Sequence, residues 1–235
     1  MNQFIQHIHK KNIPGFPGEC LQCTFNTSMY SDAIAENLLG AKLDDSLNRS
    51  VNKRKAEYVA GRFLARMGLE SLGSDQHTVF TNPDRSPLWP QAYLGSISHA
   101  NGVAICAVSK QVHTKHVGID IETVLEPKIA AELAASILVD SEIPLVGSLT
   151  NPNAEMLTLV FSAKESLYKA LYPEVGRFFG FESARILDLD FASGTFQIEL
   201  TTSLSALLPE QTCFAGQFEC GNGRLFTFIA DSISY

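Results

Sequence analysis

The sequence lacks the features that mark a membrane-spanning or secreted protein. It has no apolar run of about 18 residues, the length at which a transmembrane helix is predicted. The N-terminal segment carries polar residues, with His7 and His9 among them, where a signal peptide needs an apolar stretch. The five cysteines are an odd number and are scattered, which predicts free thiols in a reducing, cytoplasmic compartment.

An excess of positive charge is also missing. The chain has 18 Lys and Arg against 25 Asp and Glu, a formal net charge of −7. Because sequence-independent binding of nucleic acid needs a broad positive field, we expect no nucleic-acid partner. What the 235 residues do contain is an ordinary globular composition, 45% hydrophobic and 18% charged, which suits one large domain or two small ones.

Hydrophobic periodicity and turn residues predict the order of helices and strands. Residues 12–30 are rich in Pro and Gly and are expected to be irregular, with a helix beginning after Ser31. Longer helices are expected at 50–67, 127–138 and 154–171, the first ending at Gly68 and the last at Pro173. Strands are expected at 77–80, 93–98, 103–108, 116–122, 185–191, 195–200, 212–219 and 224–229.

Helices followed by strands thus occur twice along the chain. This order predicts an α+β fold with two halves, residues 1–116 and 117–235, which meet near residues 115–125.

The stretch VGIDIE, residues 117–122, carries two acids two residues apart. In a strand, Asp120 and Glu122 point to one side while Ile119 and Ile121 face the core. Two adjacent carboxylates repel each other unless a cation lies between them, and their hard oxygen atoms suit Mg²⁺. The alternative interpretation is an exposed acidic edge on a surface strand.

The stretch FSAKESLYK, residues 161–169, lies on the last long helix. Glu165 and Lys169 are four residues apart and therefore neighbours on one helix face. Glu165 could supply a third metal carboxylate, with Lys169 beside a phosphate. The alternative is an ordinary surface ion pair, which contributes little stability.

The stretch GSISHA, residues 95–100, ends an expected strand before the Asn101-Gly102 turn. A serine–histidine pair can indicate a hydrolase, but Ser98 and His99 are adjacent and no Gly-x-Ser-x-Gly elbow is present. A hydroxyl and an imidazole at a strand end suit phosphate oxygens instead. A structural histidine remains the alternative.

These three motifs follow one another in a fixed order and spacing. With them, the sequence resembles the 4′-phosphopantetheinyl transferase superfamily, in particular the larger, two-lobed type that includes the enterobactin and surfactin synthetase activators. The resemblance covers about residues 53–180 and includes the stretches RFLAR (62–66) and SPLWP (86–90). Residues 161–181 look most like the enterobactin branch.

The resemblance implies two similar α/β lobes related by pseudo-twofold symmetry. It also implies a reaction in which the phosphopantetheine arm of coenzyme A moves to a carrier-protein serine and 3′,5′-ADP is released. By similarity, Asp120, Glu122 and Glu165 hold Mg²⁺ against the coenzyme A pyrophosphate.

Further residues match the family's coenzyme A contacts. Ser98 and His99 are implied to contact the phosphates of coenzyme A, with His99 near the 3′-phosphate. Arg62 and Arg85 stand where the family has basic residues for the same ligand. Lys169 is implied to lie near the pyrophosphate and to stabilise the departing 3′,5′-ADP.

The catalytic residues expected from this resemblance are Glu165, Lys169 and Asp120. A serine hydroxyl needs a base, and Glu165 is the expected one, acting directly or through a metal-bound water. Mg²⁺, Lys169 and His99 would stabilise the charge that grows on the bridging oxygen.

The expected partner is an acidic carrier-protein domain, in siderophore, polyketide or fatty-acid synthesis, with siderophore assembly favoured by the resemblance. Lys53, Arg54 and Lys55 are either a solvated helix start or a basic rim that attracts the carrier. We expect a monomer, since the internal duplication would let one chain build the whole site.

Other interpretations compete with the transferase. A metal-dependent phosphodiesterase or pyrophosphatase would use the same carboxylates with water as the nucleophile, and a coenzyme A-binding subunit would lack catalysis. A zinc site from Cys20, Cys23, Cys213 and Cys220 is disfavoured by its spacing. His113 and His116 flank a predicted loop, and the sequence shows no partner for either.

Overall fold

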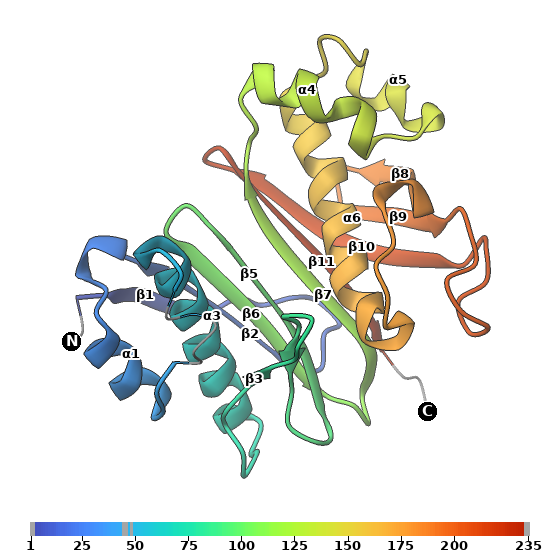
Figure 1. Cartoon of the computed structure of the whole chain (residues 1–235). Helices are drawn as coiled ribbons and strands as arrows, with labels where there is room; N and C mark the ends of the chain where they lie inside the picture. The colour runs from blue at the N-terminus through green and yellow to red at the C-terminus, as the bar shows by residue number, and fades with distance from the viewer. Residues whose placement is uncertain (1–2, 44–46, 48, 233–235) are drawn as a thin grey trace. The chain divides into compact units, whose positions relative to one another are not determined.

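Two antiparallel sheets, each packed against one long helix, form the framework of the chain in this computed structural model (Figure 1). The structure describes residues 3–43, 47 and 49–232. The chain divides into two units, the first extending to Lys115 and the second running from His116 to Asp231. The fold is therefore α+β with antiparallel sheets, as the order of elements predicts.

The first unit contains a four-stranded sheet in the order β1-β2-β6-β5. Its strands are β1 (Ile5–Lys10), β2 (Glu19–Phe25), β5 (Tyr93–Ala100) and β6 (Val103–Lys110). The helices are η1 (Thr27–Met29), α1 (Asp32–Leu39) and α3 (Asn52–Ser71), and a small hairpin joins β3 (Phe80–Thr81) to β4 (Pro87–Leu88). The helix predicted after Ser31 is confirmed, with the Ser31 hydroxyl accepting from the Ile34 amide as its N-cap.

Glycine has a different role in α3 from the one that the sequence predicts. The helix was expected to end at Gly68, but it continues to Ser71. A Cβ at Gly68 would lie 2.5 Å from the Val108 side chain of β6, and one at Gly61 would lie 2.5 Å from Ile97 of β5. Both glycines therefore let the helix approach the sheet closely.

The prediction of an irregular segment at residues 12–30 is wrong. Strand β2 runs through it and pairs antiparallel with both β1 and β6, burying Cys20, Cys23 and Phe25. The Pro and Gly residues occupy only the β1–β2 connection. Beyond that connection the long-range pairing with β6 makes the chain extended. The strand expected at 77–80 is likewise reduced to Phe80–Thr81.

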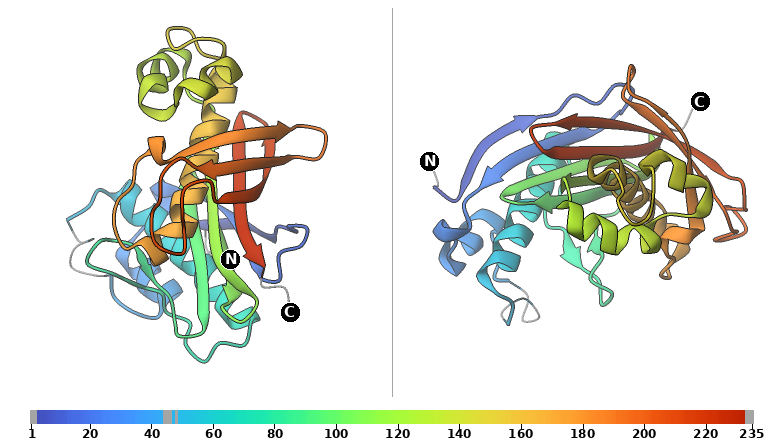
Figure 2. Two further views of the ribbon diagram at one scale, coloured as in Figure 1. Left: turned by 90° about the vertical axis from the view of Figure 1, so that its right-hand side faces the viewer. Right: turned by 90° about the horizontal axis from the view of Figure 1, so that it is seen from above.

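The second unit contains a five-stranded sheet in the order β7-β11-β10-β9-β8. Its strands are β7 (Thr114–Thr123), β8 (Ala184–Asp190), β9 (Thr195–Leu200), β10 (Cys213–Gly221) and β11 (Arg224–Ser232). The helices are α4 (Pro127–Ile137), η2 (Asp140–Glu142), α5 (Ile143–Val146), α6 (Ala154–Val175) and η3 (Phe181–Ser183). Helix α6 lies against the sheet, and α4 and α5 pack near its N-terminal end (Figure 2).

Helix α6 is longer than expected at its C-terminal end. Pro173 lies inside the last turn, where its missing N–H removes only one intrahelical hydrogen bond. The helix ends instead at Gly176, which has a φ of 65° in the left-handed region.

His116 has partners that the sequence did not reveal. Its Nδ1 lies 2.8 Å from Asp231 Oδ2 on β11, and its Nε2 lies 3.1 Å from Glu174 Oε2 on α6. These residues are more than fifty positions from His116 in the sequence, so only the folding of the second unit brings them together.

Two further expectations concern the whole chain. Within the described ranges, no helix is long and apolar enough to cross a membrane. All five cysteines are free, with Cys20, Cys23 and Cys106 buried and Cys213 and Cys220 exposed.

Candidate active site

Strand β7 places Asp120 inside the second unit rather than on an exposed edge. Ile119 and Ile121 are buried on either side of it, and Asp120 is itself only 1% exposed. Just before it, Gly118 passes so close to α6 that a Cβ there would overlap the Ser166 carbonyl oxygen. The glycine therefore lets β7 carry the buried carboxylate up to the helix, and the interpretation as a surface acidic edge does not hold for Asp120.

Two side chains of α6 hold the Asp120 carboxylate, one on each oxygen. The Lys169 ammonium donates to Oδ1 at 2.6 Å, and the Ser162 hydroxyl donates to Oδ2 at 2.7 Å. Lys169 also donates to the Ile119 carbonyl at 3.3 Å. Lys169 is thus paired with the strand carboxylate rather than with Glu165, its neighbour on the helix, so the ordinary surface pair expected as an alternative is not formed.

Glu122 and Glu165 have a different environment from Asp120. Within the described part of the chain, neither carboxyl group makes a hydrogen bond or an ion pair. Burial, reinforced by the charges of Asp120 and Glu165, raises the pKa of Glu122 to about 7, with Lys169 opposing the shift. The pKa of Glu165 is also raised by burial and, in smaller part, by Asp120, again against Lys169.

These shifts show that the three carboxylates are electrostatic neighbours. Yet among residues 3–43, 47 and 49–232, no three His, Cys, Asp or Glu side chains converge as a ready-made metal site. Like charges repel without a cation between them, and Lys169 neutralises Asp120 here. The donor set of three hard carboxylates, two of them lacking a partner among the described residues, nevertheless suits Mg²⁺.

A second lysine–carboxylate pair, buried on both sides, involves Lys164 of the same helix, five residues before Lys169. The Lys164 ammonium donates to Glu142 Oε2 at 2.6 Å and to the carbonyls of Ile137 and Phe181. Glu142 also accepts from the amides of Val139 and Ile186. This cluster joins the end of α4, the η2 turn, η3 and β8 to α6.

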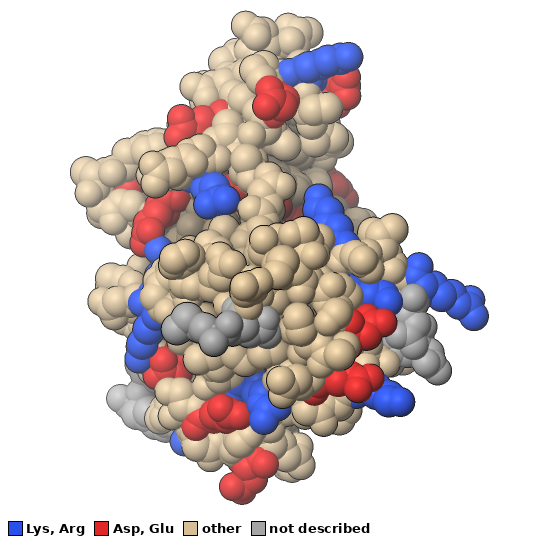
Figure 3. Space-filling model, turned by 90° about the vertical axis from the view of Figure 1, so that its left-hand side faces the viewer, with Lys and Arg blue, Asp and Glu red and all other residues tan. Residues whose placement is uncertain are grey.

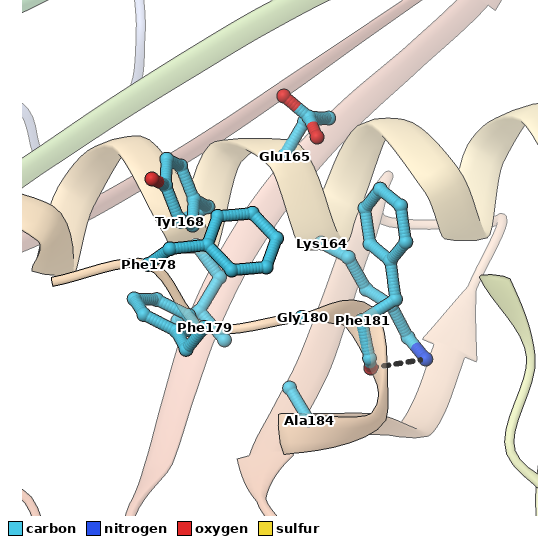
Figure 4. A pocket seen from close by; sticks show the side chains of 9 residues that line it. Lys164, Glu165, Tyr168, Phe178, Phe179, Gly180, Phe181 and Ala184 are labelled. Carbon is cyan, nitrogen blue, oxygen red and sulfur yellow. Dashed lines mark hydrogen bonds between the residues drawn. The ribbon is translucent and has the colours of Figure 1, made fainter. Parts of the chain in front are cut away.

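An aromatic cavity of about 160 Å³ lies beside Glu165 (Figure 4). Phe178, Phe179 and Phe181 from the segment after α6 form its walls with Tyr168. The Tyr168 ring lies 4.9 Å from that of Phe179 and 5.9 Å from that of Phe178, centroid to centroid. Figure 4 shows Glu165 and Lys164 pointing to opposite sides of the helix. An apolar cavity therefore lies next to a carboxylate of raised pKa.

In the first unit, β5 carries the expected serine and histidine. Ser98 is buried, and the His99 ring is held between two side chains of α3. Arg54 donates to His99 Nε2 at 3.1 Å, and Glu57 Oε2 lies 3.7 Å from Nδ1. Arg54 appeared in the sequence only as one of three clustered cations, so its contact with His99 was missed.

Arg62 lines a cavity of about 200 Å³ in the first unit, between α3 and residues 77–81. The guanidinium lies over the Tyr58 ring and donates to the Phe80 carbonyl and the Thr81 hydroxyl. It is 8% exposed, and its buried Nε has no hydrogen-bond partner in the described part of the chain. A buried cation in this state is costly, which favours an anion as an additional partner.

Arg85 lies in the tight turn between β3 and β4, exposed and with a left-handed φ of 72°. Its amide donates to the Asn82 carbonyl. The structure therefore places each predicted residue in one unit or the other: Arg62, Arg85, Ser98 and His99 in the first, and Asp120, Glu122, Glu165 and Lys169 in the second.

Comparison with known protein families assigns the class. The model of the 4′-phosphopantetheinyl transferase N-terminal domain matches residues 43–109, and that of the 4′-phosphopantetheinyl transferase superfamily matches residues 116–220. The two matches cover most of the chain and include all eight predicted site residues. The chain belongs to the 4′-phosphopantetheinyl transferase superfamily.

The individual relatives include enterobactin synthase components and other phosphopantetheinyl transferases. Enterobactin synthase component D of Salmonella typhi is 36% identical over 84% of this chain and 80% of its own length. The 4′-phosphopantetheinyl transferase Npt of Nocardia iowensis is 30% identical over 77% of this chain and 84% of its own. Svp of Streptomyces mobaraensis, also a 4′-phosphopantetheinyl transferase, is 30% identical over 77% of this chain and 74% of its own length. The predicted similarity to the enterobactin branch is confirmed.

Proposed function

We propose that the chain transfers the 4′-phosphopantetheine arm of coenzyme A to a serine of a carrier protein in siderophore assembly, with Mg²⁺ at the site. Family membership supports the reaction. The observation that carries the site assignment is the group of acids around Asp120. One carboxylate is buried and held on both oxygens, and two neighbours, Glu122 and Glu165, have raised pKa values and no partner among the described residues.

Asp120, Glu122 and Glu165 would hold the metal. Bound Mg²⁺ would neutralise the pyrophosphate of coenzyme A and stabilise the charge that develops on it. The raised pKa values of Glu122 and Glu165 support this role, because a cation removes the repulsion that contributes to them.

Two residues would act on the reacting groups directly. Glu165 would accept the proton of the carrier serine, directly or through a metal-bound water, and burial of its carboxyl group, which raises its pKa, favours proton acceptance. Lys169 is the residue best able to move, since its side chain is 26% exposed while that of Asp120 is 2% exposed. Its ammonium would pair with the oxygen that leaves with 3′,5′-ADP.

Residues of the first unit would bind the phosphates of coenzyme A. Ser98, His99 and Arg85 are assigned by resemblance. Arg62 has independent support, because its buried guanidinium lacks a partner at Nε among the described residues and lines a cavity. Arg54 joins the set through its contact with His99, since a guanidinium and an imidazole can share one phosphate.

The aromatic cavity beside Glu165 would take the pantetheine arm. That arm is attached to the phosphate under attack, so it must begin near Glu165. Phe178 is 77% exposed at the rim of the cavity, where an apolar ligand would cover it.

The carrier protein is proposed to be acidic and the enzyme a monomer. On the face drawn in Figure 3, Lys and Arg are interspersed with Asp and Glu and form no single basic patch among the residues described there. Of the cluster at residues 53–55, Lys55 is buried against Asp32, whereas Lys53 and Arg54 are exposed and Arg54 contacts His99. Steering of an acidic carrier would therefore rest on few charges.

The two units are proposed to be the two lobes of the family fold, related by pseudo-twofold symmetry, with the boundary near residue 116. Each has one long helix, α3 or α6, packed against an antiparallel sheet, which supports this assignment.

Incubation of the protein with coenzyme A, Mg²⁺ and an apo-carrier tests the proposal. Mass spectrometry should show the carrier gaining about 340 Da, the mass of a phosphopantetheine adduct on serine. Glu165→Gln should abolish the gain, whereas Glu155→Gln, an exposed position on the same helix, should leave it intact.

Two outcomes would overturn the proposal. One is the absence of a mass gain on several apo-carriers. The other is cleavage of coenzyme A at the same rate with and without carrier, which would favour the phosphodiesterase interpretation instead.

A further inference from the structure

We infer that Thr227 is a positioning residue for Asp120: its hydroxyl orders a chain of buried hydroxyl groups that fixes one carboxylate oxygen and leaves the other for the metal. The inference rests on the proposed function, because Asp120 has its metal-binding role there. Thr227 lies on β11, the strand next to β7, and belongs to none of the three sequence motifs.

Four buried residues form the chain of contacts. The Ser162 hydroxyl lies 2.7 Å from Asp120 Oδ2 and 2.9 Å from Thr227 Oγ1. The Ser166 hydroxyl lies 2.7 Å from Thr227 Oγ1, on its other side. Thr227 Oγ1 is also 2.8 Å from the Ser162 carbonyl. Ser162, Ser166 and Thr227 are fully buried, so water does not compete for these hydrogen bonds.

Counting protons gives the chain a direction. An ionised carboxylate only accepts, so the single Ser162 proton goes to Asp120. Ser162 Oγ then has no proton for Thr227, so their 2.9 Å contact is a hydrogen bond only with Thr227 as the donor. The other acceptor that Ser162 offers to the Thr227 proton is its carbonyl, at 2.8 Å. The Ser166 proton is then left for Thr227, either for its hydroxyl oxygen at 2.7 Å or for its carbonyl at 3.1 Å. With this assignment, Ser162 is the donor that holds Asp120 Oδ2.

The alternative is that these hydroxyls only attach α6 to β11. A serine within a helix can donate to a carbonyl of the preceding turn, so Ser162 does not need Asp120 to be satisfied. The Ser162 hydroxyl can therefore point either to that carbonyl or to Asp120. Thr227 favours the second orientation, because its donation to the Ser162 backbone and its contact with Ser162 Oγ hold that hydroxyl toward β7. Without the Thr227 hydroxyl, Ser162 is free to turn away and Asp120 loses a donor.

The arrangement also distinguishes the two carboxylate oxygens. Oδ1 is paired with Lys169, whose side chain is a quarter exposed and able to move to a phosphate. Oδ2 is held by Ser162, which is buried and fixed in turn by Thr227. Oδ1 is therefore the oxygen that becomes available to a cation, while Oδ2 keeps the carboxylate in place.

A matched pair of substitutions tests the inference. Thr227→Val keeps the shape and removes the hydroxyl, whereas Thr227→Ser keeps the hydroxyl and removes a methyl group. Mn²⁺ is titrated by electron paramagnetic resonance into the full chain with saturating coenzyme A and no carrier, so that no turnover occurs. Thr227→Val should weaken Mn²⁺ binding about tenfold or more, the usual effect of losing a group that orients a metal ligand. Thr227→Ser should remain near wild type.

Further variants distinguish a failure of the inference from a failure of the proposed metal site. Asp120→Asn should weaken Mn²⁺ binding more than Thr227→Val; if it does not, Asp120 is not a ligand and both the inference and the metal part of the proposed function fall. If Asp120→Asn weakens binding but the two Thr227 variants match each other, the inference alone is wrong. Should Thr227→Val fail to fold, Ser162→Ala removes the last donor and should weaken binding by a similar factor; unchanged binding in Ser162→Ala would also overturn the inference.

Discussion

Helix α6 carries two lysine–carboxylate pairs five residues apart, and their environments differ completely. Lys164 with Glu142 and Lys169 with Asp120 each have an N–O distance of 2.6 Å. The side chains of the first pair are 2% and 0% exposed, whereas Lys169 is 26% exposed. Distance alone therefore does not distinguish a structural ion pair from one in an active site.

The difference lies in how completely the polar groups are satisfied. Lys164 makes three hydrogen bonds, and both Glu142 oxygens have partners, so this cluster is closed. Burial lowers the pKa of Lys164, and Glu142 opposes that shift. Beside Lys169, in contrast, Glu122 and Glu165 remain without partners among the described residues. A closed cluster stabilises the fold, and an incomplete one can bind a ligand.

Removing the ammonium of the closed pair should have the largest effect. Lys164→Met leaves Glu142 buried without its counterion, and breaking a buried pair in this way costs about 3–5 kcal/mol. The variant should unfold at much lower urea concentration than wild type, with an unchanged m-value. Lys169→Met is the matched control on the same helix. Equal loss of stability in the two variants would show that the pairs do not differ as described.

Removing the ammonium of Lys169, beside the incomplete cluster of Asp120, Glu122 and Glu165, should instead affect turnover. Lys169→Met should lower kcat for transfer to the carrier by about a hundredfold, the scale found when one donor to a developing negative charge is lost. Its thermal midpoint should stay closer to wild type than that of Lys164→Met. An unchanged kcat with a raised KM for coenzyme A would assign Lys169 to ground-state binding rather than to the leaving group.

Much of this framework follows from local sequence patterns. The strands at 93–98, 103–108 and 195–200 are found within two residues of their expected ends, because their alternation and the Asn101-Gly102 turn are local features. Gly68 and Pro173 were misread for the opposite reason. A glycine that allows close packing and a glycine that ends a helix look alike until the partner strand is known.

The site could be predicted only in part. The acids of β7 and α6 belong to recognisable motifs, and their type points to a cation. Thr227, Glu142 and Arg54 belong to no such motif, because their roles depend on contacts between segments that are far apart in the sequence. Whether Asp120 would be buried was also undecidable, since alternation alone predicts one face of β7 as polar, whereas the folded strand is covered on both.

The smallest expected effect concerns Glu122. It tests whether the incomplete cluster of Asp120, Glu122 and Glu165 can bind a cation. Its pKa rises from the ordinary 4.5 to about 7 in the folded chain, so between these values the folded state binds more protons than the unfolded state. Stability from this group is therefore present at low pH and is lost as pH rises through about 7. With a chelator present, the thermal midpoint of wild type should fall between pH 6 and pH 8 by more than that of Glu122→Gln. Added Mg²⁺ should stabilise wild type more at pH 8 than at pH 6, because the bound carboxylate must be deprotonated. Identical pH profiles for the two proteins would mean that Glu122 is ionised like an ordinary surface acid, and the contrast with the closed pair would then rest on Glu165 alone.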